Sequence, residues 1–165
     1  MSTAFTIRRA VPDDVEAIAS VQAESWRETY ADLVGDPDHT VFAVEWRVNM
    51  WERLLADAEQ ERPVVAVVAN ATGGEAIIGF AAAAPSEGED VVRPLELTML
   101  YLLAEAHGSG AGQALLDAVL GDRPASLWVA QVNPRAHAFY RRNGFAPDGA
   151  TMTFPPLGEA VRLVR

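Results

Sequence analysis

The spacing of hydrophobic residues changes several times along the chain, and each spacing predicts an element. Residues 5–10 alternate as in a short strand, and apolar residues then recur at helical spacing behind Pro12-Asp13-Asp14, a sequence typical of a helix start. We therefore predict a helix over about 12–31. Residues 35–39 (GDPDH) break the pattern, and a second helix is expected over about 40–60.

The rest of the chain alternates strands with short helices. Residues 62–85 contain two apolar runs around a glycine turn, which predicts a hairpin. Further strands are expected at 93–104, 125–132, 146–154 and 159–165, with helices that end at Gly121 and at Asn143-Gly144. A strand, a helix and a strand in that order normally form a right-handed parallel crossover. We therefore expect one α/β domain over residues 1–165, with a mixed sheet and helices on both faces.

Composition narrows the class of protein. Half of the 165 residues are hydrophobic, yet the longest apolar runs are no longer than a strand, so no membrane span is expected. The first residues contain no apolar leader, which favours a cytoplasmic location. The absence of cysteine excludes disulfides, a thiolate nucleophile and cysteine-bound metal, and no residue spacing is typical of another metal site.

The charged residues limit the kinds of partner and chemistry that the chain can have. The net charge is −10 and all 13 basic residues are arginine. A chain without lysine has neither a P-loop nor a Schiff base. An acidic surface repels nucleic acid and suits cationic substrates, so we expect no nucleic-acid partner.

Residues 107–113 (HGSGAGQ) place three glycines at alternate positions directly before a helical pattern. Such a loop is either a tight turn or a cradle of backbone N–H groups for an anion. A dinucleotide-binding fingerprint would need glycine at position 113, which is Gln113, and no window fits the G-x-S-x-G pattern of serine hydrolases.

The loop, its glycines Gly110 and Gly112, and the flanking segments together resemble the GNAT superfamily of acetyl-CoA-dependent N-acetyltransferases. The similarity includes LYLLAEAHGSGAGQALL (100–116), LWVAQVNPRAHAFYRRNGF (127–145) and, more loosely, SWRETYADLVGD (25–36). One position departs from the superfamily pattern, because His107 stands where Gln or Arg is usual. The resemblance implies a mostly antiparallel mixed sheet of six to seven strands, with one splayed parallel pair and about four helices on its faces.

The resemblance also implies a binding site for acetyl-CoA. The pyrophosphate would lie on the loop and the start of its helix, which include His107, Gly108, Ser109, Gly110, Ala111, Gly112 and Gln113. The strand before the loop would bulge at Leu100, Tyr101 and Leu102, leaving backbone groups free for the pantetheine arm and the thioester oxygen. Asn133, which is also expected to cap the next helix, would contact the cofactor.

Two residues are candidates for acid–base chemistry. Glu96 lies between leucines in an apolar strand, either at a solvent-facing edge or as a general base of raised pKa. Tyr140 is either core packing or, by resemblance, the general acid that protonates the CoA thiolate. Trp26 and Tyr30 are either core packing, the more common role of aromatic residues at helical spacing, or, by the resemblance, part of the lining of the acceptor site, where Asp32, Asp36 and Asp38 nearby would attract an ammonium group.

The expected activity is acetyl transfer from acetyl-CoA to a primary amine of a small molecule or peptide, by direct attack and without metal. A non-catalytic acyl-CoA-binding regulatory module shares the loop but needs neither Glu96 nor Tyr140, and a nucleotide-binding protein is disfavoured by Gln113 and the missing lysine. Members of the superfamily often dimerise, which leaves a homodimer open.

Overall fold

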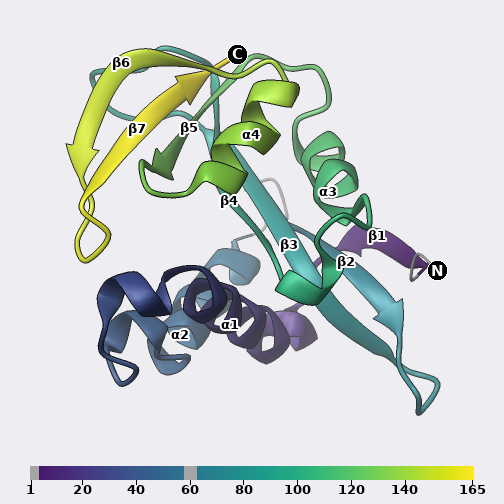
Figure 1. The fold of residues 1–165 in the computed structure, drawn as a ribbon. Helices are drawn as coiled ribbons and strands as arrows, with labels where there is room; N and C mark the ends of the chain where they lie inside the picture. The colour runs from purple at the N-terminus through teal and green to yellow at the C-terminus, as the bar shows by residue number, and fades with distance from the viewer. Residues whose placement is uncertain (1–3, 58–62) are drawn as a thin grey trace.

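A single sheet of seven strands organises the computed structural model, which describes residues 4–57 and 63–165 (Figure 1). The strand order is β1-β2-β3-β4-β5-β7-β6. The strands are β1 (Phe5–Arg9), β2 (Val64–Ala69), β3 (Glu75–Pro85), β4 (Leu95–Leu102), β5 (Ala125–Ala130), β6 (Ala146–Thr153) and β7 (Glu159–Val164). The helices are α1 (Val15–Val34), α2 (Glu45–Ala56), α3 (Ala111–Val119) and α4 (Pro134–Arg142), with short 3-10 turns η1 (Pro12–Asp14), η2 (Thr40–Phe42) and η3 (Ala104–Ala106).

The predicted fold class is confirmed: neighbouring strands are antiparallel except for β4 and β5, which form one parallel pair. The second predicted helix begins later than expected, because Ala43 is extended after η2 and delays α2 until Glu45. Residues 58–60, the last of that predicted helix, lie outside the described part of the chain. Helix α1 continues to Val34, where Gly35 adopts the left-handed conformation that ends it (φ 74°).

The two faces of the sheet carry separate hydrophobic layers. On one face, Leu115 and Leu116 of α3 pack with Leu127 of β5 and Tyr140 of α4. On the other face, α1 and α2 cover the sheet through a second cluster, in which Trp51 is fully buried against Phe80. Figure 1 shows α1 and α2 together below the sheet, with α3 and α4 on the opposite side. No helix among the described residues has both the length and the apolar character needed to cross a membrane.

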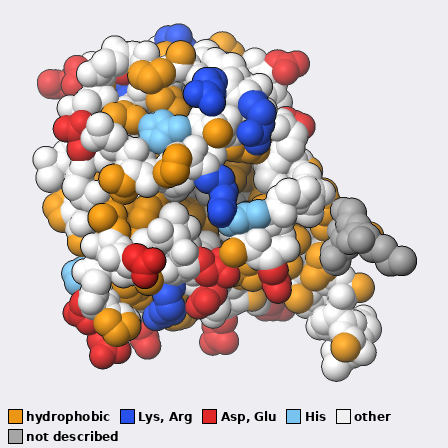
Figure 2. All heavy atoms as spheres, in the orientation of Figure 1, with side chains coloured by type: hydrophobic (Ala, Val, Ile, Leu, Met, Phe, Trp, Pro, Cys, Tyr) orange, Lys and Arg blue, Asp and Glu red, His pale blue; other side chains and the backbone are white. Residues whose placement is uncertain are grey.

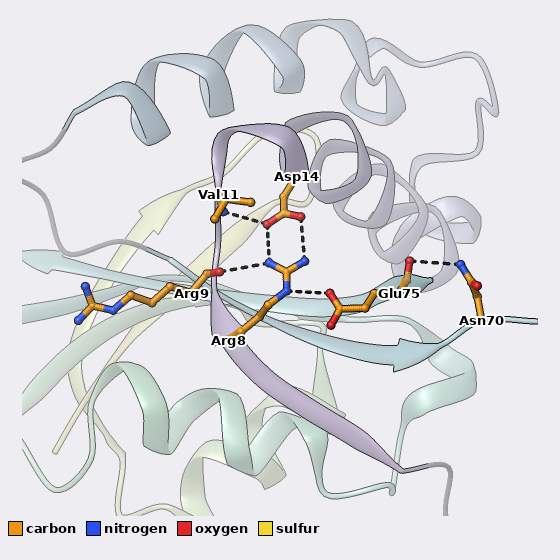
Figure 3. A network of polar contacts seen from close by, with 6 residues as sticks. All are labelled: Arg8, Arg9, Val11, Asp14, Asn70 and Glu75. Carbon is orange, nitrogen blue, oxygen red and sulfur yellow. Dashed lines mark hydrogen bonds and ion pairs between the residues drawn. The ribbon is translucent and has the colours of Figure 1, made fainter. Parts of the chain in front are cut away.

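A polar network ties the first strand to the helical layer (Figure 3). The Arg8 guanidinium donates to both carboxylate oxygens of Asp14, at 2.7 and 3.0 Å, and to Glu75 of β3 at 2.9 Å. Asp14 also accepts from the backbone N–H of Val11 at 2.9 Å. These hydrogen bonds hold the pKa of the Asp14 carboxyl below its usual range. The network therefore fixes η1, from which α1 starts, against β1 and β3.

Candidate active site

Strands β4 and β5 pair only at their first residues and then separate. Leu95 lies opposite Ala125 and Glu96 opposite Ser126, and no further pair follows. A cavity of about 290 Å³ lies where the two strands diverge. Its lining comes from α1, β4, β5, α4 and the end of the chain: Trp26, Tyr30, Glu96, Leu97, Thr98, Met99, Leu100, Tyr101, Trp128, Val129, Ala130, Asn133, Ala136, Tyr140, Met152, Phe154, Leu157 and Ala160.

A bulge in β4 sets which side chains face the cavity. The register with β3 places Ala82 opposite Met99 and Ala83 opposite Leu97, so Thr98 is the extra residue. The bulge thus lies before Leu100, and its expected position at residues 100–102 is wrong. Because Leu95 and Leu97 pack on the α3 side of the sheet, alternation directs Glu96 to the α1 side, the side on which Met99 packs after the bulge.

The backbone of β4 beyond the bulge offers unpaired groups to the gap. The N–H of Leu103 donates to the carbonyl of Ile78 at 2.9 Å, which fixes the alternation of the antiparallel ladder. Leu100 and Leu102 are therefore in non-hydrogen-bonded pairs with β3, and their N–H and C=O groups point toward β5, which does not pair with them. Of these groups, the Leu102 carbonyl is instead bonded to His107. The backbone of Tyr101 points the other way, toward β3, so this residue contributes its ring to the cavity rather than its amide.

The glycine loop needs glycine at two of its three positions. Gly108 and Gly110 have φ of +77° and +92°, and Gly110 is the residue directly before α3. Ser109 accepts from the N–H of Ala111 at 3.2 Å. Gly112 lies inside α3 without such a φ, and a Cβ there would lie 3.8 Å from Phe139 and 3.9 Å from Leu102, ordinary contact distances. The fold itself therefore has room for a Cβ at position 112.

The side chains of the loop and of α4 surround the start of α3. His107 contacts the carbonyl of Leu102 through Nε2 at 3.1 Å, and Arg135 of α4 donates to its Nδ1. Gln113 is directed elsewhere, because its amide donates to Asp117 and Asn143. Figure 2 shows basic side chains over α4, exposed hydrophobic side chains in a hollow beneath it, and acidic ones gathered over α1. Despite its net charge of −10, the protein thus presents positive charge beside the glycine loop.

Asn133 caps α4, as the sequence predicts, and also reaches across the cavity. Its side-chain oxygen accepts from the N–H of Ala136 at 3.1 Å, and its amide nitrogen donates to the Tyr30 hydroxyl at 3.0 Å. Helix α4 is thereby linked to α1, on the opposite side of the sheet. Burial raises the pKa of Tyr30, against the effect of this hydrogen bond.

Glu96 and Tyr140 both line the cavity, and burial alters the acidity of each. Desolvation raises the pKa of the half-buried Glu96 carboxyl above its usual range, and it raises the pKa of the buried Tyr140 phenol as well. The Tyr140 ring packs between Phe139 and Phe145, with centroids at 5.3 and 5.7 Å. Its hydroxyl makes no hydrogen bond to another described residue.

An aromatic group forms the α1 side of the cavity. Trp26 and Tyr30 lie there as expected, and the Trp26 ring contacts Tyr101 and Phe154, with centroids at 6.4 and 6.1 Å. Asp32, Asp36 and Asp38 are exposed and do not line the cavity, so their attraction of an ammonium group stays a prediction.

Sequence reasoning missed several residues that the fold brings to the site. Trp128 has a half-buried position that strand alternation alone could have suggested. Arg135 and Phe154 carry no signal in the sequence, because an arginine in a first helical turn and an aromatic residue in a loop are common on surfaces. No group of three or more histidine, aspartate or glutamate residues in the described part of the chain could hold a metal ion.

Comparison with known proteins identifies this arrangement. Residues 60–147, just over half of the chain, match the family model described as an acetyltransferase (GNAT) domain. The chain belongs to the GNAT acetyltransferase family. The GNAT family is one of acetyl-CoA-dependent acyltransferases, and this chain is therefore such an enzyme.

Similar proteins agree with the GNAT assignment. The chain is 29% identical to the uncharacterized N-acetyltransferase YuaI of Bacillus subtilis over 135 residues, which cover 78% of this chain and 73% of YuaI. It is 40% identical to the uncharacterized N-acetyltransferase Rv2669 of Mycobacterium tuberculosis over 84 residues, which cover 47% of this chain and 51% of Rv2669.

Solved GNAT structures share the fold. PaiA N-acetyltransferase of Thermoplasma acidophilum, in complex with coenzyme A, superposes with a TM-score of 0.63 at 21% identity, covering 96% of this chain and 98% of PaiA. A GNAT acetyltransferase of Bacillus cereus gives 0.67 at 14% identity, covering 98% and 96% of the two chains.

Proposed function

We propose that the whole chain is one N-acetyltransferase domain that moves an acetyl group from acetyl-CoA to a primary amine by direct attack in a ternary complex. The observation that carries this proposal is the cavity between β4 and β5, which Glu96 and Tyr140 both line beside the unpaired N–H of Leu100. Each of the three groups suits one step of the reaction. Glu96 is a base for the ammonium proton, the Leu100 N–H is a donor to the thioester oxygen, and Tyr140 is an acid for the sulfur.

Acetyl-CoA supplies the activated acetyl group, and the residues of the glycine loop suit its pyrophosphate. The N–H of Ala111, the first of α3, donates to Ser109, while the next two, those of Gly112 and Gln113, have no partner among the described residues and can bind an anion. A Cβ at Gly108 or Gly110 would meet open space. His107 and Arg135 add positive or polar groups beside them. The pantetheine arm would run along the unpaired edge of β4, over Leu100 and Leu102, and past Asn133.

Glu96 is proposed to take the proton from the acceptor ammonium, directly or through water. Partial burial raises its pKa, so the carboxylate is a stronger base than an exposed glutamate. The Leu100 N–H would stabilise the negative charge that develops on the thioester oxygen. Tyr140, kept protonated by burial, would donate to the sulfur as the carbon–sulfur bond breaks.

Replacing Glu96 tests this proposal. Glu96→Gln preserves the shape of the side chain and cannot accept a proton, so kcat/KM should fall about 10²- to 10⁴-fold, while acetyl-CoA still binds. The release of free thiol from acetyl-CoA in the presence of amines measures the rate, and calorimetry measures the binding. In the parent enzyme the acidic limb of the pH profile should follow the raised pKa of Glu96. An unchanged rate and pH profile in the variant would assign the base to water or another group.

A further inference from the structure

Building on the proposed amine acetylation, we propose that the acceptor is a small primary amine carried by an aromatic or apolar group, with no second positive charge. The family assignment leaves the acceptor open, and the lining of the cavity narrows it. Three independent features point the same way: the chemistry of the lining, a buried positive charge behind it, and the exposed hydrophobic residues at its mouth.

The lining contains a single carboxyl group and no basic side chain. That carboxyl belongs to Glu96, and the proposed reaction already uses it for the reacting ammonium. The remaining surface on the α1 side is aromatic or apolar, with Trp26, Tyr101 and Trp128 as its largest members. A second ammonium would therefore lose its hydration without gaining a counter-charge, which is costly.

A buried arginine behind the lining also disfavours the binding of a second positive charge in the cavity. Arg47 of α2 is fully buried, stacks on Trp46 at 4.2 Å and lies 5.8 Å from the Trp26 ring. Its one hydrogen bond goes to the carbonyl of Ala43, and it forms no ion pair with another described residue. Burial lowers the pKa of Arg47 to about 10, so it remains charged at neutral pH. Its uncompensated charge makes the α1 side of the cavity unfavourable for diamines and polyamines.

The opening and the size of the cavity suit a small apolar group. Met152 and Phe154 line the cavity and are 42% and 38% exposed, and we call these two residues the mouth of the cavity. An apolar group of the acceptor would cover both and gain the free energy of that burial. The volume of about 290 Å³ is at the lower end of the range for ligand pockets, which favours a small amine over an aminoglycoside.

A comparison of acceptors tests the proposal directly. We expect kcat/KM for 2-phenylethylamine to exceed that for 1,4-diaminobutane by about 10-fold or more, since the diamine buries a charge and leaves the aromatic surface uncovered. Binding of phenylethylamine to the CoA-bound protein should also change the fluorescence of Trp26 and Trp128. Equal or faster acetylation of the diamine would overturn the proposed class. Much faster acetylation of a short peptide with N-terminal phenylalanine would overturn it in favour of a peptide acceptor.

A charge introduced at the mouth gives a matched test. Phe154→Glu should lower kcat/KM for phenylethylamine about 10-fold and raise it for the diamine. The control, Val11→Glu, changes a residue of similar exposure (42%) in the segment after β1, outside the cavity lining, and should leave both values unchanged. If Phe154→Glu keeps the parent's selectivity between the two amines, Phe154 does not contact the acceptor.

The same assay separates this proposal from the proposed function. If the protein binds acetyl-CoA by calorimetry and acetylates the diamine best, only the acceptor class is wrong. If it binds acetyl-CoA and acetylates no amine or peptide of the panel, amine acetylation itself is wrong, and the acceptor class falls with it.

Discussion

Burial gives Tyr140 the properties of a proton donor that stays neutral. A free tyrosine has a pKa of about 10 and a thiol of the cysteine type about 8.5, so full transfer from the phenol to a finished thiolate is already uphill by about 2 kcal/mol. Desolvation raises the phenol pKa further and increases that cost. In the proposed reaction the hydroxyl would therefore act only during the breaking of the carbon–sulfur bond, when charge on sulfur is still growing.

Removing this hydroxyl should slow the reaction without disturbing the fold. Tyr140→Phe keeps the ring that packs against Phe139 and Phe145. We expect kcat to fall about 100-fold or more, near 3 kcal/mol of barrier, with little change in acetyl-CoA affinity. Steady-state kinetics and calorimetry measure the two quantities. A kcat within threefold of the parent would show that Tyr140 only packs.

A substitution at Gly112 can test ligand binding, because the backbone conformation at this position does not itself need glycine. Its backbone is ordinary helix, and a Cβ there meets only ordinary contacts. Gly112→Val should therefore fold, and should abolish detectable acetyl-CoA binding in calorimetry because the side chain occupies space beside the loop. Ala118→Val, an exposed position of the same helix, controls for the lower helix propensity of valine. Normal acetyl-CoA binding by Gly112→Val would show that the ligand does not lie against position 112.

Single residues were predictable where their own chemistry is local. The capping role of Asn133 follows from the proline after it, and Gly110 follows from the start of a helix. The hydrogen bond from Asn133 to Tyr30 spans 103 positions of sequence and has no local signal. Arg135 beside His107 and Arg47 between two tryptophans were likewise unpredictable, since both depend on how helices meet.

At the scale of elements, the pattern of apolar residues and turns predicted every strand but not the bulge in β4, which decides what faces the cavity. Thr98 looks like an ordinary strand residue, and only pairing with β3 reveals it as the bulge. The need for glycine at position 79 of β3 likewise shows only in the folded sheet. A Cβ there would lie 2.6 Å from the Leu102 side chain and 2.8 Å from the Tyr101 carbonyl. The close approach of β3 to the end of β4 is thus built into the sheet, and it holds the unpaired backbone of β4 in place.

The contact of η1 with β1 predicts a pH-dependent stability. Because the folded-state pKa of Asp14 is depressed, its contribution is present above the ordinary pKa of 3.8 and is lost as the pH falls through the folded value. Asp14→Asn should lower the free energy of unfolding by about 2 kcal/mol at pH 7. The difference from the parent, measured by urea unfolding, should shrink below pH 3.8. A constant difference across this range would exclude the carboxylate as its source.

At the scale of the whole molecule, the sheet consists of two parts joined by a short seam. Strands β1–β4 and strands β5–β7 share two residue pairs, and the hydrophobic layers of α3 and α4 complete the junction. The sequence predicted the parallel pair from its crossover, and only the resemblance implied that it splays. Alternating residues look the same whether or not a neighbouring strand continues beside them.

A ligand that fills the seam should stabilise both parts together. At a concentration 100-fold above its dissociation constant, acetyl-CoA should stabilise the protein by about 2.7 kcal/mol, which raises Tm by roughly 5–10 °C. We expect free CoA to give a similar shift, because the proposed contacts involve groups that both molecules share. Thermal unfolding with each ligand measures this. The absence of any shift with either would contradict binding in the gap.

The separation of β4 and β5 also bears on how fast the enzyme can work. The proposed contacts of the pyrophosphate with α3 and of the pantetheine arm with β4 do not involve the acetyl group, so CoA keeps them after the reaction, while the contact of the Leu100 N–H with the thioester oxygen is lost. Free CoA should therefore occupy the same gap and compete with acetyl-CoA. The ratio of acetyl-CoA to free CoA in the surroundings would then govern the rate of acetylation.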